Sequence, residues 1–392
     1  MENQNQKKIH WFIPFVLFFA VMACNLPTGE EGSESIMQNP QENITGLLDS
    51  SSDVQLTPVE LSTKTETIGT EPGMSRLNPY PSDTEIVTPF WDFKVHEIAR
   101  GEIAWQIIQA DDPGNQPPPP GMEYLIVKIW LRNKNPSTNI QNLGLDEIFI
   151  TGDDLQVHGD IIKDRPAPEV VFTDISPGEI LEGWIDVLVE STEGNFMLVF
   201  DRAEYIDGES TPREVRYVAL EEGASIEVPP ELKAISPNEL GIEIENPAKI
   251  GEKVIGEDWE VTILEAVRGQ AALDIVMQMS DKNPPPEDGM EYIAFQARIR
   301  RISMEDIRQY RPNFFAYAPG AGLQSSDFIW EPRGVNNRNP ESFPWMAFYF
   351  FPGLESEGWF VLTAPADQKP QIARFDVGGD FQTRNRYLQL TP

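Results

Sequence analysis

Apolar and polar residues alternate along two segments that begin 168 residues apart in the chain. The apolar series falls on every second position in both segments, which is the period of a half-buried β-strand. Ile126 and Trp130 are apolar exceptions on the polar side of the first segment. The alternating positions are Leu125, Val127, Ile129 and Leu131 in the first segment, and Ile293, Phe295, Ala297 and Ile299 in the second.

Other short segments predict further strands, and each half of the chain also has one predicted short helix. Residues 101–110 and 269–278 instead show helical spacing, with Ala104, Trp105 and Ile108 on one face and Ala272, Leu273 and Val276 at the matching positions. Thirty-four prolines and 28 glycines favour many turns over long helices. The remaining predicted strands are 91–98, 183–189, 196–201 and 215–220, with counterparts at 259–266, 358–362, 371–376 and 385–390.

The two series belong to an internal duplication. Residues 78–124 align with 246–292 without a gap, and 15 of the 47 positions are identical. The match resumes at 177–184 and 352–359 with a small shift. We therefore expect two copies of one domain, at 76–222 and 243–392, joined by a linker at 223–242. Two long copies are typical of tandem independent domains and not of a repeat array.

Several motifs recur in the same order in both copies. Each has an Asn-Pro pair, a strand that begins with Trp, Arg-Gly before the short helix, Gly-Met-Glu-Tyr, and Glu-Gly-Trp. This series resembles the bacterial telokin-like, immunoglobulin-like domain of unknown function found in many surface lipoproteins. The first copy departs from the pattern at 81–86. The resemblance implies an immunoglobulin-like sandwich in each copy, no established activity and no catalytic residues.

The expected fold class is therefore all-β, with two tandem immunoglobulin-like antiparallel β-sandwiches that each carry one short helix. They would follow a signal peptide at 1–23 and a disordered acidic, Ser/Thr-rich tether at 24–75. The tether has no aromatic residue and cannot bury enough apolar surface to offset its chain entropy.

The N-terminus has the composition of an export signal. Lys7 and Lys8 precede an apolar run at 9–23, and Cys24 follows. The sequence Val-Met-Ala-Cys resembles the lipobox of bacterial lipoproteins, which predicts acylation of Cys24 and membrane lipid as a partner. An ordinary signal peptide with an incidental cysteine is the alternative. Cys24 is the only cysteine, so the rest of the chain has no disulfide and no thiolate site.

The export signal indicates where the protein is located, and the charge of the chain argues against nucleic acid as a partner. We expect a lipid-anchored protein on the outer face of the bacterial cytoplasmic membrane or on the cell surface. The net charge of −33 argues against nucleic-acid binding, because phosphate contacts require Lys and Arg.

Candidate chemistry is sparse. His96 and His158 are the histidines beyond the signal segment, and both are interpreted as polar-face or loop residues. Asp153, Asp154 and Asp160 are candidate calcium ligands, since extracellular sandwiches bind calcium through loop oxygens; a solvated turn is the alternative. No cofactor is expected.

The function expected from the sequence is a non-catalytic binding or structural module of the cell envelope, and not an enzyme. A secreted hydrolase that uses carboxylates and a calcium or ligand sensor are the alternatives. An unknown extracellular protein or glycan would be the partner. The candidate partner surface consists of Trp130, Phe343, Trp345 and Phe348.

Overall fold

The computed structural model describes residues 71–392 with several gaps, and these residues belong to one compact unit. Cys24, the signal segment and nearly all of the tether therefore lie outside the described residues. The gaps are 137–139, 145–146, 159–169, 171–172, 207–208, 280–282, 313, 319–321, 325–348, 368–371, 380–382 and 391–392.

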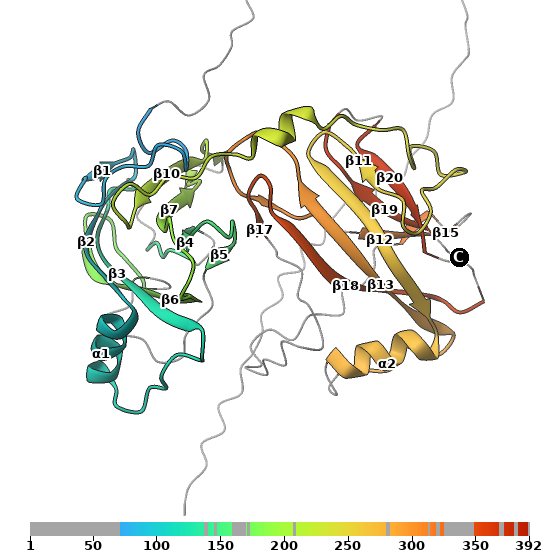
Figure 1. Cartoon of the computed structure of the whole chain (residues 1–392), viewed down its shortest axis with the longest axis horizontal. Helices are drawn as coiled ribbons and strands as arrows, with labels where there is room; N and C mark the ends of the chain where they lie inside the picture. Colours follow the sequence, from blue (N-terminus) through green and yellow to red (C-terminus); the bar gives the residue numbers. More distant parts are fainter. Residues whose placement is uncertain are drawn as a thin grey trace, which may run out of the picture. The chain divides into compact units, whose positions relative to one another are not determined.

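The first copy forms two antiparallel four-stranded sheets with a core between them (Figure 1). A small hairpin, β8 (Tyr205–Ile206) and β9 (Glu209–Ser210), extends from it. The first sheet has the order β1 (Ile86–Val87), β2 (Trp91–Arg100), β3 (Met122–Asn133) and β6 (Ile180–Glu190); the second has β10 (Glu214–Ala219), β7 (Met197–Arg202), β4 (Ile148–Thr151) and β5 (Val157–His158).

The second copy repeats this arrangement. A short 3-10 helix, η1 (Pro230–Ala234), lies in the segment between the two copies, and a two-stranded pair joins β14 (Gln309–Tyr310) to β17 (Tyr349–Phe350). Its sheets have the orders β11 (Val254–Ile255), β12 (Trp259–Arg268), β13 (Met290–Arg301), β18 (Glu355–Pro365), and β16 (Gly322–Gln324), β15 (Phe314–Ala318), β19 (Ile372–Asp376), β20 (Asn385–Gln389).

The duplication holds at the level of strand register. Trp91 pairs with Asn133 in the first copy, and Trp259 pairs with Arg301 at the matching positions of the second. Both copies also carry a register shift at the same place, between Val95 and Glu97 and between Ile263 and Glu265. The departure at 81–86 does not remove the first strand, since β1 and β11 occupy matching positions.

The predicted alternation is confirmed, because every apolar position of both series is buried in its sandwich core. Trp91 and Trp259 begin matching strands and are each 1% exposed. Phe93 stacks on Phe200 across the first core, with ring centroids 5.1 Å apart. The fold class is therefore all-β, with two tandem antiparallel sandwiches, as the sequence predicted.

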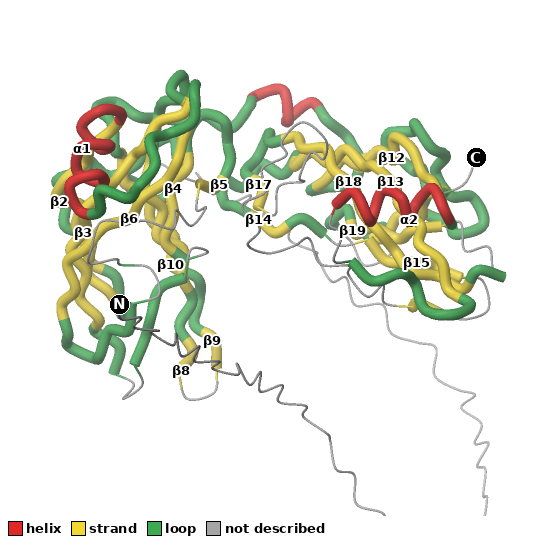
Figure 2. The backbone as a smooth tube through the Cα atoms, turned by 90° about the horizontal axis from the view of Figure 1, so that it is seen from below, coloured by secondary structure: helices red, strands yellow, loops and turns green. Residues whose placement is uncertain are grey.

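The two predicted helices are also confirmed, as α1 (Gly101–Asp111) and α2 (Gln270–Met279) (Figure 2). Each packs on the outer face of its sheet: Ala104 and Ile108 of α1 are buried against Ile126. This contact explains why Ile126 breaks the alternation. Among the described residues, neither helix has the length and apolarity needed to cross a membrane.

Buried ion pairs connect the two copies. The Arg76 guanidinium donates to Asp306 at 2.6 Å, and Arg308 donates to Asp201 at 2.7 Å. The hydroxyl of Tyr217 donates to the backbone oxygen of Asp306 at 2.8 Å. The expectation of independent domains did not include this contact, because residues so far apart in sequence give no sign of pairing. The predicted domain boundaries stay a prediction.

Candidate functional site

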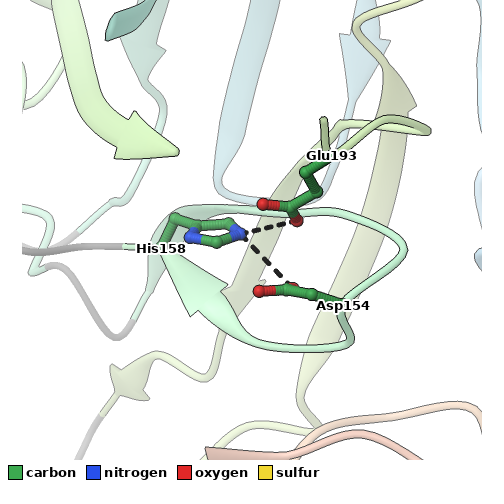
Figure 3. A group of neighbouring side chains, drawn as sticks. All are labelled: Asp154, His158 and Glu193. Atoms are coloured by element: carbon green, nitrogen blue, oxygen red, sulfur yellow. Dashed lines mark hydrogen bonds and ion pairs between the residues drawn. The ribbon is translucent and has the colours of Figure 1, made fainter. Parts of the chain in front are cut away.

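Two carboxylates meet one imidazole at the edge of the second sheet of the first sandwich (Figure 3). Nε2 of His158 lies 2.9 Å from Oε1 of Glu193 and 3.4 Å from Oδ1 of Asp154. One ligand atom from each of the three residues lies within 4.8 Å of the other two. We refer to Asp154, His158 and Glu193 as the carboxylate–histidine cluster.

Local structure places Asp154 in the tight turn between β4 and β5, and His158 at the end of β5. β4 pairs with β5 through Ile150 and His158, so the chain reverses between them. Leu155 has φ of 64°, a left-handed conformation that non-glycine residues rarely adopt. Oδ1 of Asp154 accepts a hydrogen bond from the backbone N–H of Gln156 at 2.8 Å, which closes the turn.

Glu193 reaches the cluster from a different loop, the one that follows β6. Its side chain is 3% exposed, and its buried Oε2 has no hydrogen-bond partner within the described ranges. Gly152 lies directly beneath the carboxylate, because a Cβ atom at this glycine would lie 2.2 Å from Oε1 of Glu193. Any larger residue at 152 would thus compete with the carboxylate for this space.

The three groups perturb one another electrostatically. Burial would lower the pKa of His158, but hydrogen bonds and charge attraction from Asp154 and Glu193 outweigh it and raise that pKa to about 9. Burial would raise the pKa of Asp154, yet the hydrogen bond and charge of His158 hold it below its usual value. Burial raises the pKa of Glu193, and the nearby Asp154 carboxylate adds to this rise.

Arg100 lies beside the cluster but pairs with other carboxylates. The Arg100 guanidinium donates to the carboxylates of Glu123 and Glu221 and to the backbone oxygen of Glu193. The ring of His158 packs edge-on against Phe196, with centroids 6.1 Å apart. With a neutral imidazole, the part of the chain that the structure describes places no cation at hydrogen-bond distance from the two carboxylates. The cluster is therefore suited to hold either a proton on His158 or a bound cation.

The structure separates the residues predicted as calcium ligands. Asp154 belongs to the cluster, whereas Asp153 is exposed and accepts a 3.4 Å hydrogen bond from Gly194. Asp160 lies outside the described residues. Glu193 was not among the residues predicted from the sequence. The only sequence signal for Glu193 is its position in the loop after a predicted strand. Calcium binding by these residues remains a prediction.

The two histidines have different surroundings. His158 was interpreted as a loop or polar-face residue, but it lies in β5 with its side chain 13% exposed. His96 falls at the register shift of β2, is 38% exposed and lies 3.9 Å from Glu182. The difference arises because the Glu193 loop covers only His158.

The candidate partner surface is only partly described. Trp130 is half-buried on β3, and the guanidinium of Arg132 lies 5.6 Å from the centre of its ring. Phe343, Trp345 and Phe348 lie outside the described residues, as does Cys24.

A small cleft in the first sandwich is a separate candidate site, and Trp91, Arg202, Glu204 and Glu214 contribute to its lining. Glu204 accepts hydrogen bonds from Trp91 Nε1 at 2.7 Å, from Arg202, and from Asn135 at 2.9 Å. Glu214 pairs with Arg216 at 2.6 Å. Both acids are thus engaged with structural donors.

Comparisons with known proteins give little beyond this description. No family model matches the chain, and no curated protein does. A crystal structure of a conserved hypothetical protein from Bacillus anthracis matches 31% of this chain and 88% of its own length, at 13% identity and a TM-score of 0.23. An uncharacterised β-sandwich protein from Clostridium difficile matches 37% of this chain and 95% of its own length, at 11% identity and a TM-score of 0.22.

Proposed function

We propose that this chain is a lipid-anchored, non-catalytic binding module of the bacterial cell envelope. Acylated Cys24 would hold it in the membrane, the tether would carry it outward, and the two sandwiches would meet an extracellular protein or glycan. The motifs that resemble telokin-like domains of surface lipoproteins are the reason for this proposal, together with the export signal before Cys24.

The observation that carries the non-catalytic part of this proposal is the hydrogen bonding of Glu204. A hydrolase that works with two carboxylates needs one acid that carries a proton at its working pH. Glu204 is the more buried acid of the cleft beside Trp91, and its two oxygens accept three hydrogen bonds from Trp, Arg and Asn donors. Both oxygens of this carboxylate are therefore held by buried side-chain donors, and the acid forms part of the structural hydrogen-bond network of the sandwich.

The contact between the copies supports binding through a combined surface. Breaking a buried ion pair by losing one partner is costly, so the pairs Arg76–Asp306 and Arg308–Asp201 favour the two sandwiches remaining together. A partner could then contact both copies at once, which increases the apparent affinity without new contacts in either copy.

The anchor is tested by cell fractionation of the full-length protein. We expect the wild type in the membrane fraction and the Cys24→Ala variant in the soluble exported fraction. Mass spectrometry of the extracted wild type should show an acylated N-terminal Cys24. An unmodified cysteine, or a variant that stays in the membrane fraction, would contradict the anchor.

Binding is tested by site-specific photo-crosslinking in intact envelopes. A photoreactive phenylalanine analogue at Trp130 should give one discrete crosslinked product, since this side chain belongs to the proposed partner surface. The same analogue at Tyr205, which is 70% exposed on the β8–β9 hairpin, serves as the control. Equal or absent crosslinking at both positions would argue against a partner at Trp130.

A further inference from the structure

The carboxylate–histidine cluster has the donors of a transition-metal site. Zn²⁺ and related first-row divalent ions are bound by imidazole nitrogen and carboxylate oxygen at about 2.0–2.2 Å. Tetrahedral coordination at such lengths places neighbouring ligand atoms roughly 3.3 Å apart. The distances from Nε2 of His158 to the two carboxylate oxygens, 2.9 Å and 3.4 Å, are close to this spacing.

We propose that Asp154, His158 and Glu193 bind one first-row divalent cation of the Zn²⁺ type. The cation would take the place of the proton on Nε2, and the three side chains would leave room in its coordination sphere for water or a partner's ligand. Calcium fits less well, because it takes six to eight oxygen ligands and the cluster offers a nitrogen and two carboxylates.

Glu193 provides an independent reason to expect a cation. Its side chain is almost fully buried, yet Oε2 has no hydrogen-bond partner among the residues that the structure describes. Leaving a buried charged oxygen unpaired is costly, and a metal ion supplies a direct partner for such an oxygen. The chain also keeps a glycine at 152, where a Cβ atom would occupy the space of the carboxylate.

The surrounding charges point the same way. With neutral His158, the cluster carries two negative charges, and even with a protonated imidazole one negative charge remains in excess. Among the described residues, the guanidinium of Arg100 donates to the backbone oxygen of Glu193, but its charge is already paired with Glu123 and Glu221. A divalent cation balances both carboxylates at once, which a single proton does not.

The position of the cluster gives a bound ion a structural effect. Leu155, the residue after Asp154, packs against the core of the second sandwich, and a Cβ atom at Gly353 would lie 3.4 Å from its side chain. A metal that holds Asp154 and His158 together would therefore also hold the turn that carries Leu155 against the second copy.

The test is isothermal titration of the detergent-extracted, chelator-treated full-length protein with Zn²⁺ and, separately, with Ca²⁺. We expect one Zn²⁺ per chain with a dissociation constant in the micromolar range or below, and binding of Ca²⁺ at least 100-fold weaker. Co²⁺ titration should add the visible absorption of a low-symmetry nitrogen–oxygen site. Tighter binding of Ca²⁺ than of Zn²⁺ would overturn the assignment.

Matched variants locate the site. His158→Gln and Glu193→Gln should each weaken Zn²⁺ binding at least tenfold, while Asp153→Asn and His96→Gln should change it less than twofold. Circular dichroism and a thermal scan identify variants that fail to fold. If a folded His158→Gln protein binds Zn²⁺ as tightly as the wild type, or if Asp153→Asn weakens binding equally, the ion binds elsewhere and the proposal is wrong.

If either cluster variant fails to fold, Gly152→Ala replaces it, because the added methyl group would lie 2.2 Å from Oε1 of Glu193, closer than to the backbone oxygen of Gly194 at 3.0 Å. Weaker Zn²⁺ binding in this folded variant supports the site, and unchanged binding contradicts it. All these variants keep Cys24, so loss of metal binding is distinguishable from loss of membrane anchoring.

Discussion

At the scale of single residues, the chemistry of the first sandwich depends on which side chains cover one another. His96 and His158 are the same residue type in the same copy, yet only His158 has two carboxylates at its ring nitrogen. The Glu193 loop removes water from one imidazole and leaves the other exposed. Two residue-scale predictions follow from this difference, one for pH and one for a glycine.

Stability should fall with rising pH in chelator-treated protein, where His158 holds only the proton. Its folded pKa of about 9 lies above the ordinary 6.5, so protonation stabilises the fold fully below pH 6.5. This contribution is lost as pH rises through 9, and it amounts to at most about 3 kcal/mol. Denaturant unfolding between pH 6.5 and 9 measures it. His158→Gln should remove the slope in this range, and an unchanged slope would contradict the assignment to His158.

Gly152→Ala should destabilise the protein, because the new Cβ atom would lie 2.2 Å from Oε1 of Glu193. The buried carboxylate must then move away from His158, at a cost of about 1–3 kcal/mol. Gly194→Ala is the matched control: this neighbour of Glu193 also has a backbone open to alanine, and its added Cβ would make only ordinary contacts of 3.6 Å or more. Equal destabilisation in urea unfolding would show that the Glu193 contact is not responsible.

At the scale of elements, each short helix acts as a cover for one sheet. Without a helix, Tyr124 and Ile126 on the outer face of the first sheet would be exposed to water. α1 packs over both side chains. The matching residues Tyr292 and Ala294 lie under α2. The repeat of this arrangement in both copies indicates that helix and sheet are one packing unit and not separate additions.

Ile108→Ala in α1 should therefore cost about 2–5 kcal/mol, the usual effect of removing a fully buried isoleucine side chain. Ile103 lies on the same helix but is 64% exposed, so Ile103→Ala should change the free energy of unfolding by less than about 0.5 kcal/mol. Chemical denaturation of the two variants compares them directly. A similar loss in both would show that burial of Ile108 under the helix is not what stabilises this packing unit.

At the scale of the whole molecule, the two copies share buried contacts as well as ancestry. Phe351 of the second copy packs with Phe149, Val199 and Tyr217 of the first. The guanidinium of Arg76 lies 4.2 Å from the centre of the Phe351 ring while it pairs with Asp306. An apolar cluster thus surrounds ion pairs that are shielded from water, where the loss of one charge is expensive.

Arg76→Met should lower the free energy of unfolding by about 3–5 kcal/mol, because Asp306 would stay buried without its cation. The double variant Arg76→Met with Asp306→Leu should recover much of this loss, since neither charge remains to be desolvated. Arg298→Met is the matched control, because its pair with Glu357 is exposed and therefore contributes little to stability. Calorimetry of these three variants measures the losses of stability. If the double variant recovers none of the stability lost in Arg76→Met, the buried ion pair does not explain the loss.

Much of the architecture could be read from the chain alone. Period-two alternation placed β3 and β13, helical spacing placed α1 and α2, and the internal match predicted two similar sandwiches. These features are local, or they repeat a local pattern, and the hydrophobic effect acts on them through burial of one face. The residue types of the candidate chemistry, including Asp154 and His158, were also visible.

Only the tertiary structure decided which of those residues meet. Glu193 joins His158 from 35 positions away, and Asp306 joins Arg76 from 230 positions away. No periodic pattern encodes such pairs, because they depend on how strands are ordered in a sheet and on which loop covers which edge. The sequence alone determined the sandwiches and their duplication, whereas the closeness of buried charges followed from chain reversals that only the folded protein contains.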